Sequence, residues 1–106
     1  MVMMFAVKEA REQLEKEGIV YTLRPYPRKQ LEYDWYNYFR GDTSKGRIFI
    51  QYVRTIYDFP YSFPIKLELE EFVGESGFKT VSDWLKRVKI RDMTVYLYRV
   101  RLVEKY

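Results

Sequence analysis

The alternation of apolar and polar residues predicts a helix followed at once by a strand near the start of the chain. Residues 7–17 are strong helix formers, and Gly18 follows as the residue type that most often closes a helix. The apolar residues of this segment share one helical face and are Val7, Ala10 and Leu14. Residues 19–24 then alternate as a strand, which places Thr22 and Arg24 on the same face.

Two longer strands and two further helices are predicted in the rest of the chain. Residues 47–57 are rich in β-branched and aromatic residues, and residues 94–103 alternate over ten positions, so both are predicted as strands. Residues 66–73 favour a short helix. A second helix is expected from Thr80, whose hydroxyl would cap the first helical amides, to about Lys89.

This order of elements predicts one α+β domain that spans residues 1–106 and contains an antiparallel, barrel-like sheet. A chain of this length buries roughly 65% of its unfolded surface, which is enough for a single core. No apolar run approaches the ~20 residues that a membrane span requires. The N-terminal apolar run lacks a basic region before it, so we do not expect a signal peptide, and we expect a cytoplasmic protein.

The chain contains neither cysteine nor histidine. The absence of cysteine excludes disulfides, thiolate nucleophiles and zinc sites built on cysteine. The absence of histidine removes the commonest metal ligand and the commonest general base near neutral pH. We therefore expect no metal and no cofactor. Charged residues make up 32% of the chain, with one Asn and three Gln, a bias that resembles hyperthermophile proteins.

Aromatic and basic residues are concentrated in the connection that follows the first strand. Six aromatic rings lie between Tyr26 and Phe39, interleaved with Arg28, Lys29 and Arg40. Planar faces beside cations are suited to stacking bases and holding phosphates. The aromatic residues have no clean period over 28–46, so a loop with a short helical or extended piece is expected there. Part of the run, including Trp35, is expected to pack as a lid over the sheet.

The net charge of +4 is distributed in segments. Residues 21–55 carry seven basic and three acidic side chains, and residues 84–106 carry seven and two. Residues 56–83 reverse the sign, with two basic and six acidic side chains. If the fold brings the two basic segments together, they would form a face that attracts an anionic partner. The alternative is a solvated surface of mixed charge.

Three segments in this order resemble the archaeal ASCH proteins, a branch of the PUA-like superfamily. They are Gly18–Arg24 after the first helix, Glu75–Leu85, and Tyr96–Leu102 in the closing strand. The resemblance implies a PUA-like antiparallel β-barrel with two or three flanking helices. It also implies a cleft beside the first segment and a ligand that is RNA or a nucleotide.

One branch with this pattern, the small bacterial N4-acetylcytidine amidohydrolases, has a threonine where this chain has Thr22. In that branch the threonine is the nucleophile and acts with a lysine and a downstream glutamate. Ile19 stands at the lysine position here, and an alkyl side chain cannot activate a hydroxyl. Glu75 lies near the position of the glutamate. The resemblance to this branch is therefore incomplete at the residue that catalysis requires.

Three functions remain open from the sequence. The leading hypothesis is a non-catalytic RNA- or nucleotide-binding module whose cleft is lined by Thr22, Arg24 and Tyr26. Its basic approach surface would consist of Arg28, Lys29, Arg40, Lys45 and Arg47. Glu75 is a further candidate ligand-binding residue. The second is a small hydrolase of a modified nucleoside, or a ribonuclease, with Thr22 as the catalytic residue. The third is a protein-interaction module, with the aromatic loop forming a homodimer contact.

Arg24 is the residue that best distinguishes these hypotheses. Its planar guanidinium can bind a phosphate or a base edge. Alternatively it forms an internal ion pair with an acidic residue such as Glu68 or Glu75. A carboxylate partner would argue against the binding site.

Overall fold

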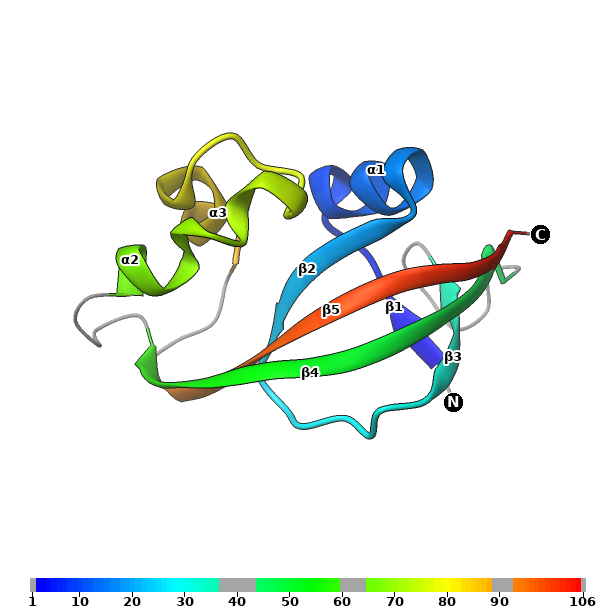
Figure 1. Cartoon of the computed structure of the whole chain (residues 1–106), viewed down its shortest axis with the longest axis horizontal. Helices are drawn as coiled ribbons and strands as arrows, with labels where there is room; N and C mark the ends of the chain where they lie inside the picture. The colour runs from blue at the N-terminus through cyan, green and yellow to red at the C-terminus, as the bar shows by residue number, and fades with distance from the viewer. Residues whose placement is uncertain (1, 37–43, 60–64, 89–92, 106) are drawn as a thin grey trace.

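A computed structural model of the chain describes residues 2–36, 44–59, 65–88 and 93–105. Figure 1 shows a long two-stranded ribbon with helices packed along it. The elements in chain order are β1 (Val2–Met4), α1 (Lys8–Glu17), β2 (Ile19–Arg24), β3 (Glu32–Tyr36), β4 (Gly46–Phe59), α2 (Ile65–Glu70), a 3-10 turn η1 (Val73–Glu75), α3 (Val81–Arg87) and β5 (Met93–Lys105). The described residues contain no helix with the length and hydrophobicity needed to cross a membrane.

The first predicted helix and strand are found nearly as expected. Helix α1 begins at Lys8, one residue later than predicted, and its C-cap Gly18 has a φ of 76°, in the left-handed region where glycine carries little strain. The Gly18 amide donates to the carbonyl of Leu14, 2.9 Å away, and so satisfies one of the last helical carbonyls. Strand β2 begins directly after this turn and has the predicted limits.

The described strands form one sheet in the order β1-β3-β4-β5-β2. Strand β1 pairs in parallel with β3, and the other pairings are antiparallel. Strand β3 is the extended piece expected within residues 28–46. Strands β1 and β2 are the two edges of the sheet, because no pairing joins them in the described part of the chain. The α+β class with a mainly antiparallel sheet is therefore confirmed.

The β4–β5 ribbon divides the core into two hydrophobic clusters. Successive residues of β5 face opposite sides of the sheet, so Val95 and Leu97 join one cluster while Tyr98 and Val100 join the other. The β4 register shifts between Tyr52 and Arg54, which leaves one extra residue on that strand, as in a β-bulge. This shift lies between the pair of Tyr98, which belongs to cluster 1, and the pair of Leu97, which belongs to cluster 2.

Cluster 1 fills the space among the sheet, β1 and α1. Its members are Met3, Phe5, Ala10, Leu14, Val20, Tyr33, Trp35, Ile48, Ile50, Tyr98 and Val100. Trp35 was expected in a partly buried lid, but only 1% of it is exposed, so its ring is a core residue. The Tyr98 hydroxyl contacts both the amide and the carbonyl of Arg28 and so holds the connection after β2 against the sheet.

Cluster 2 packs α2, η1 and α3 against the other face of the ribbon. Its members are Leu23, Ile56, Leu69, Phe72, Val81, Trp84, Val95 and Leu97. The predicted cap of α3 is confirmed, because the Thr80 hydroxyl accepts a hydrogen bond of 3.1 Å from the Asp83 amide. Helix α3 is described as far as Arg87. The predicted end at Lys89 lies outside the described residues.

A close approach of backbones joins the two clusters at α1. Gly77 precedes α3 and has a φ of 94°, and a Cβ at this position would clash with the carbonyl oxygen of Glu9. Only glycine therefore permits both the backbone conformation and the contact. The Arg87 guanidinium crosses the same boundary, with its Nη2 3.4 Å from Oε1 of Glu9. These two contacts fix α3 relative to α1.

We expect Gly77→Ala to lower the free energy of unfolding by about 3 kcal/mol. Roughly 1–2 kcal/mol of this comes from the left-handed φ and roughly 1–3 kcal/mol from the clash with α1. Gly18→Ala should lower the free energy of unfolding only by the contribution of the left-handed φ, because nothing lies within 4 Å of its added Cβ. Gly74→Ala, with open space and no positive φ, is the neutral control. Urea denaturation measures all three, and equal losses for Gly77→Ala and Gly18→Ala would contradict the close contact.

Candidate functional site

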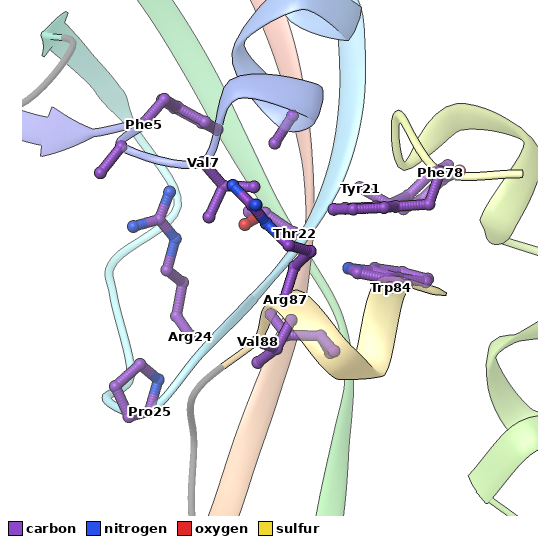
Figure 2. A pocket seen from close by; sticks show the side chains of 13 residues that line it. Phe5, Val7, Tyr21, Thr22, Arg24, Pro25, Phe78, Trp84, Arg87 and Val88 are labelled. Carbon is purple, nitrogen blue, oxygen red and sulfur yellow. The ribbon is translucent and has the colours of Figure 1, made fainter. Parts of the chain in front are cut away.

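A pocket of about 590 Å³ lies along the free edge of β2. The chain after β1 and the first turn of α1 form one wall, and α3 forms another (Figure 2). The residues that line it are Phe5, Ala6, Val7, Ala10, Tyr21, Thr22, Leu23, Arg24, Pro25, Phe78, Trp84, Arg87 and Val88. The segment Gly18–Arg24, singled out from the sequence, therefore supplies one side of the pocket.

The strand register determines which backbone groups of β2 point toward the pocket. The Leu102 amide donates to the carbonyl of Gly18, 2.8 Å away, which marks this pair as hydrogen-bonded. Hydrogen-bonded pairs recur at every second residue of an antiparallel ladder, so Thr22 and Arg24 also pair with β5 through their backbones. The backbone amide and carbonyl groups of Tyr21 and Leu23 then point away from β5, toward the pocket.

Arg24 reaches the pocket from the last position of β2. Its guanidinium carbon lies 4.9 Å from the centroid of the Phe5 ring, close enough for a cation–π contact. Its Nε is shielded from solvent and has no hydrogen-bond partner in the described part of the chain. No ion pair involves Arg24 there either. The proposed acidic partners lie elsewhere: Glu68 has a buried oxygen without a partner, and Glu75 is exposed on η1.

Burial, and secondarily the positive charge of Arg28, lowers the pKa of Arg24 to about 9. A lowered pKa means that the folded protein disfavours the charged form, although the guanidinium still carries its proton at neutral pH. The free-energy cost arises because no counter-ion replaces the lost water. An anion bound at this position would remove part of that cost.

Arg87 is a second cation of the pocket, and the sequence analysis did not single it out. It lies in the last turn of α3, and Figure 2 shows its side chain extending toward Thr22. Its partner is Glu9, at 3.4 Å, and about half of the Arg87 side chain remains exposed. The only sequence signal for it was the positive charge of residues 84–106. Two guanidinium groups thus reach one pocket from different elements.

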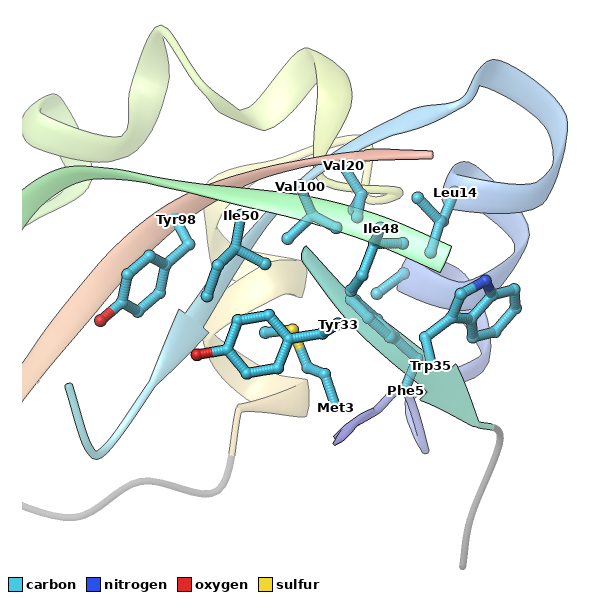
Figure 3. Packing of buried hydrophobic residues seen from close by; sticks show 11 residues of the cluster. Met3, Phe5, Leu14, Val20, Tyr33, Trp35, Ile48, Ile50, Tyr98 and Val100 are labelled. Carbon is cyan, nitrogen blue, oxygen red and sulfur yellow. The ribbon is translucent and has the colours of Figure 1, made fainter. Parts of the chain in front are cut away.

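Aromatic side chains form much of the remaining wall. They are Phe5, Tyr21, Phe78 and Trp84. Phe5 is held in place by Trp35, with an edge-to-face contact of 5.9 Å between ring centroids, and Figure 3 shows the two side chains in cluster 1. Trp84 belongs to cluster 2 and is 2% exposed, yet it also borders the pocket. The pocket therefore combines cations with rigid planar rings.

Thr22 is the buried hydroxyl of the pocket and is 8% exposed. Among the described lining residues there is no carboxylate, lysine amine or histidine that could take its proton. Ile19, at the position of the catalytic lysine in the amidohydrolases, is not a lining residue. The geometry offers Thr22 as a hydrogen-bonding group and offers no base to make it a nucleophile.

Several predicted binding residues lie away from the pocket. Tyr26 is 74% exposed beyond the end of β2, and Arg28 lies over the Tyr33 ring, 5.9 Å from its centroid. Lys29 and Lys45 are exposed. Arg47 forms an ion pair of 3.8 Å with Glu32 on β3. Arg40 lies outside the described residues, as does Phe39 of the predicted aromatic lid.

No protein-family model, curated protein or solved structure matches this chain. The resemblance to ASCH proteins therefore stays a prediction. Within the described residues no group of three or more His, Cys, Asp or Glu side chains could hold a metal ion. The chemistry of the site accordingly rests on the guanidinium, hydroxyl, aromatic and backbone groups described above.

We expect Arg24→Met to raise the free energy of unfolding at pH 7 by about 1–2 kcal/mol, because it removes a buried charge that has no ion-pair partner among the described residues. The cost of the charge is fully present below the folded pKa of about 9 and decreases as the pH rises above it, since the unfolded arginine holds its proton more tightly. Urea titrations at pH 7 measure the effect.

Arg87→Met is the matched control. It breaks a half-exposed ion pair and should lower the free energy of unfolding by no more than about 1 kcal/mol. A loss of stability in Arg24→Met as large as that in Arg87→Met would show that the Arg24 guanidinium is stabilised by a partner and is not poised for a ligand.

Proposed function

We propose that this protein binds a nucleotide, either free or as part of single-stranded RNA, in the pocket along β2. The observation that carries the proposal is Arg24: a guanidinium with a shielded Nε, a lowered pKa and no carboxylate partner in the described chain. Proteins retain such groups where binding requires them, since stability alone would favour an apolar side chain. A phosphate would supply the missing negative charge and accept the hydrogen bonds of the planar guanidinium.

The rest of the pocket is suited to binding the base of the nucleotide. Phe5, Tyr21 and Trp84 offer ring surfaces against which a base can stack, and the outward backbone groups of Tyr21 and Leu23 can hydrogen-bond its edge. A volume of about 590 Å³ falls within the range of small-ligand sites, roughly 300–1,000 Å³. A site of this size takes one nucleotide and excludes a duplex.

We further propose that the fold is the PUA-like barrel implied by the ASCH resemblance. The support is the mainly antiparallel pairing of the described strands and the position of the pocket beside Gly18–Arg24, where the resemblance implies a cleft. The described helices flank the sheet without interrupting it.

The two alternative functions have less support from the site. A hydrolase would need a base near Thr22, and the described lining residues provide none. A protein-interaction module or homodimer would use exposed aromatic residues, and Tyr26 and Tyr57 are exposed at 74% and 67%. Neither of these tyrosines lines the pocket, so they leave the unpartnered arginine unexplained.

Calorimetric titration with the four ribonucleoside 5′-monophosphates tests the proposal. We expect at least one to bind, and Arg24→Ala to weaken its affinity by about tenfold to hundredfold, which corresponds to roughly 1–3 kcal/mol for a charge-assisted contact. Arg24→Lys should be intermediate, because it keeps the charge and loses the planar fork.

Arg54→Ala is the control for loss of a positive charge. Arg54 pairs with Glu71 at 3.7 Å and is not a lining residue, so the variant should bind as the wild type does. The proposed function is wrong if none of the four nucleotides binds at millimolar concentration. It is also wrong if Arg24→Ala binds them unchanged.

A further inference from the structure

The sheet carries a second group of cations that the pocket does not use. Arg99 and Arg101 alternate on β5, so both face the same side, about 7 Å apart along the strand. Their cross-strand partners on β4 and β2 face that side too. We call this surface the arginine face, and it consists of Ile19, Tyr21, Phe49, Gln51, Arg99 and Arg101.

The arginine face is the uncovered half of one side of the ribbon. Toward one end of that side, Val95 and Leu97 are buried beneath α2 and α3 in cluster 2. Two residues further along β5 the side chains change from apolar to basic: Arg99 is half-buried and Arg101 is exposed. The change in residue type coincides with the end of the helical cover.

The arginine face differs from the neighbouring arginines of β4 in its ion pairing. No ion pair involves Arg99 or Arg101 in the described part of the chain, although Arg47 and Arg54 on β4 each have a glutamate partner. The Arg101 guanidinium instead lies over the ring of Phe49, 5.8 Å from its centroid. This contact restricts the guanidinium and places it beside an aromatic plane.

The arginine face is continuous with the pocket through Tyr21. This residue lines the pocket and is the cross-strand partner of Arg99. Arg101 follows next along the same side of β5. A linear anion that leaves the pocket at Tyr21 would therefore meet the two guanidiniums in succession.

We propose that the arginine face binds the sugar-phosphate backbone of single-stranded RNA, one nucleotide of which occupies the pocket. The proposal rests on the proposed function and extends it from a nucleotide to a strand. Charge alone would also suit an acidic peptide. RNA is favoured because the Phe49 ring lies beside the Arg101 guanidinium, Tyr21 is the cross-strand neighbour of Arg99, and an exposed amide, Gln51, is available for base edges.

The two sites can be tested separately by measuring the affinity for a mononucleotide and for a single-stranded RNA of about ten nucleotides. An RNA of this length is longer than the pocket can hold, so it must also contact the protein outside the pocket. The wild type should bind the RNA more tightly than the mononucleotide. The double variant Arg99→Ala/Arg101→Ala should lose about tenfold to a thousandfold in RNA affinity and keep its mononucleotide affinity. The slope of log affinity against log salt concentration should fall in magnitude by about 1.4 for the two lost phosphate contacts.

The matched control is Lys16→Ala/Lys79→Ala, which removes two exposed cations that lie on neither surface. It should leave RNA affinity within about twofold of the wild type if the arginine contacts are local rather than a general field effect. Thermal unfolding of both double variants checks that each is folded. An equal loss in the two double variants would overturn the proposal.

The remaining outcomes distinguish this inference from the proposed function. Equal affinity of the wild type for the mononucleotide and the RNA would overturn the arginine face and leave the pocket intact. RNA binding that requires Arg99 and Arg101 but not Arg24 would support the arginine face and contradict the pocket. Binding of polyglutamate as tightly as RNA would replace RNA with an acidic protein partner.

Discussion

The antiparallel pairing of β4 with β5 is the interaction on which the rest of the structure depends. Because successive β5 residues face opposite sides, one strand supplies both clusters, and the β-bulge after Tyr52 lies between the Tyr98 pair of cluster 1 and the Leu97 pair of cluster 2. Strand β5 also holds β2 by its other edge. That pairing leaves the outer edge of β2 open to the pocket and orients Thr22 and Arg24 toward it.

Arg24 lowers the stability of the fold but offers a charge that a ligand can neutralise. The strand register carries its guanidinium into a partly apolar site beside Phe5, where burial lowers its pKa and leaves its Nε without a partner. An ordinary core position would hold an apolar side chain. Arg87, also in the pocket, has Glu9 as a counter-ion and is half exposed, so it carries a smaller cost. Arg87 has a carboxylate beside it and Arg24 has none in the described part of the chain, which points to Arg24 as the group that a ligand neutralises.

Local signals in the sequence predicted local structure well. The limits of β2, the stop at Gly18 and the cap at Thr80 follow from residues that are neighbours in the chain. The sequence also placed Thr22 and Arg24 together, because strand alternation needs no knowledge of the fold. Tyr26 was grouped with them only by proximity along the chain, and it lies outside the pocket because β2 ends at Arg24. Arg87 and the parallel β1–β3 pairing depend on contacts between distant segments, which periodicity does not report.

The two basic segments of the sequence meet in the sheet, but not as one basic face. Residues 21–55 and 84–106 were expected to form such a face only if the fold brought their charges together. The β2–β5–β4 register brings residues 21–55 beside Arg99 and Arg101 only through Tyr21, Phe49 and Gln51, none of which is basic. There Tyr21 and Phe49 flank Arg99 and Arg101, whereas other basic residues of these segments, such as Arg47, are paired within the protein. Net charge is therefore a poor guide to the anion-binding surface of this protein. The cations without an ion-pair partner in the described part of the chain, beside aromatic rings and next to the pocket, define it better, because a phosphate can neutralise them without breaking an internal ion pair.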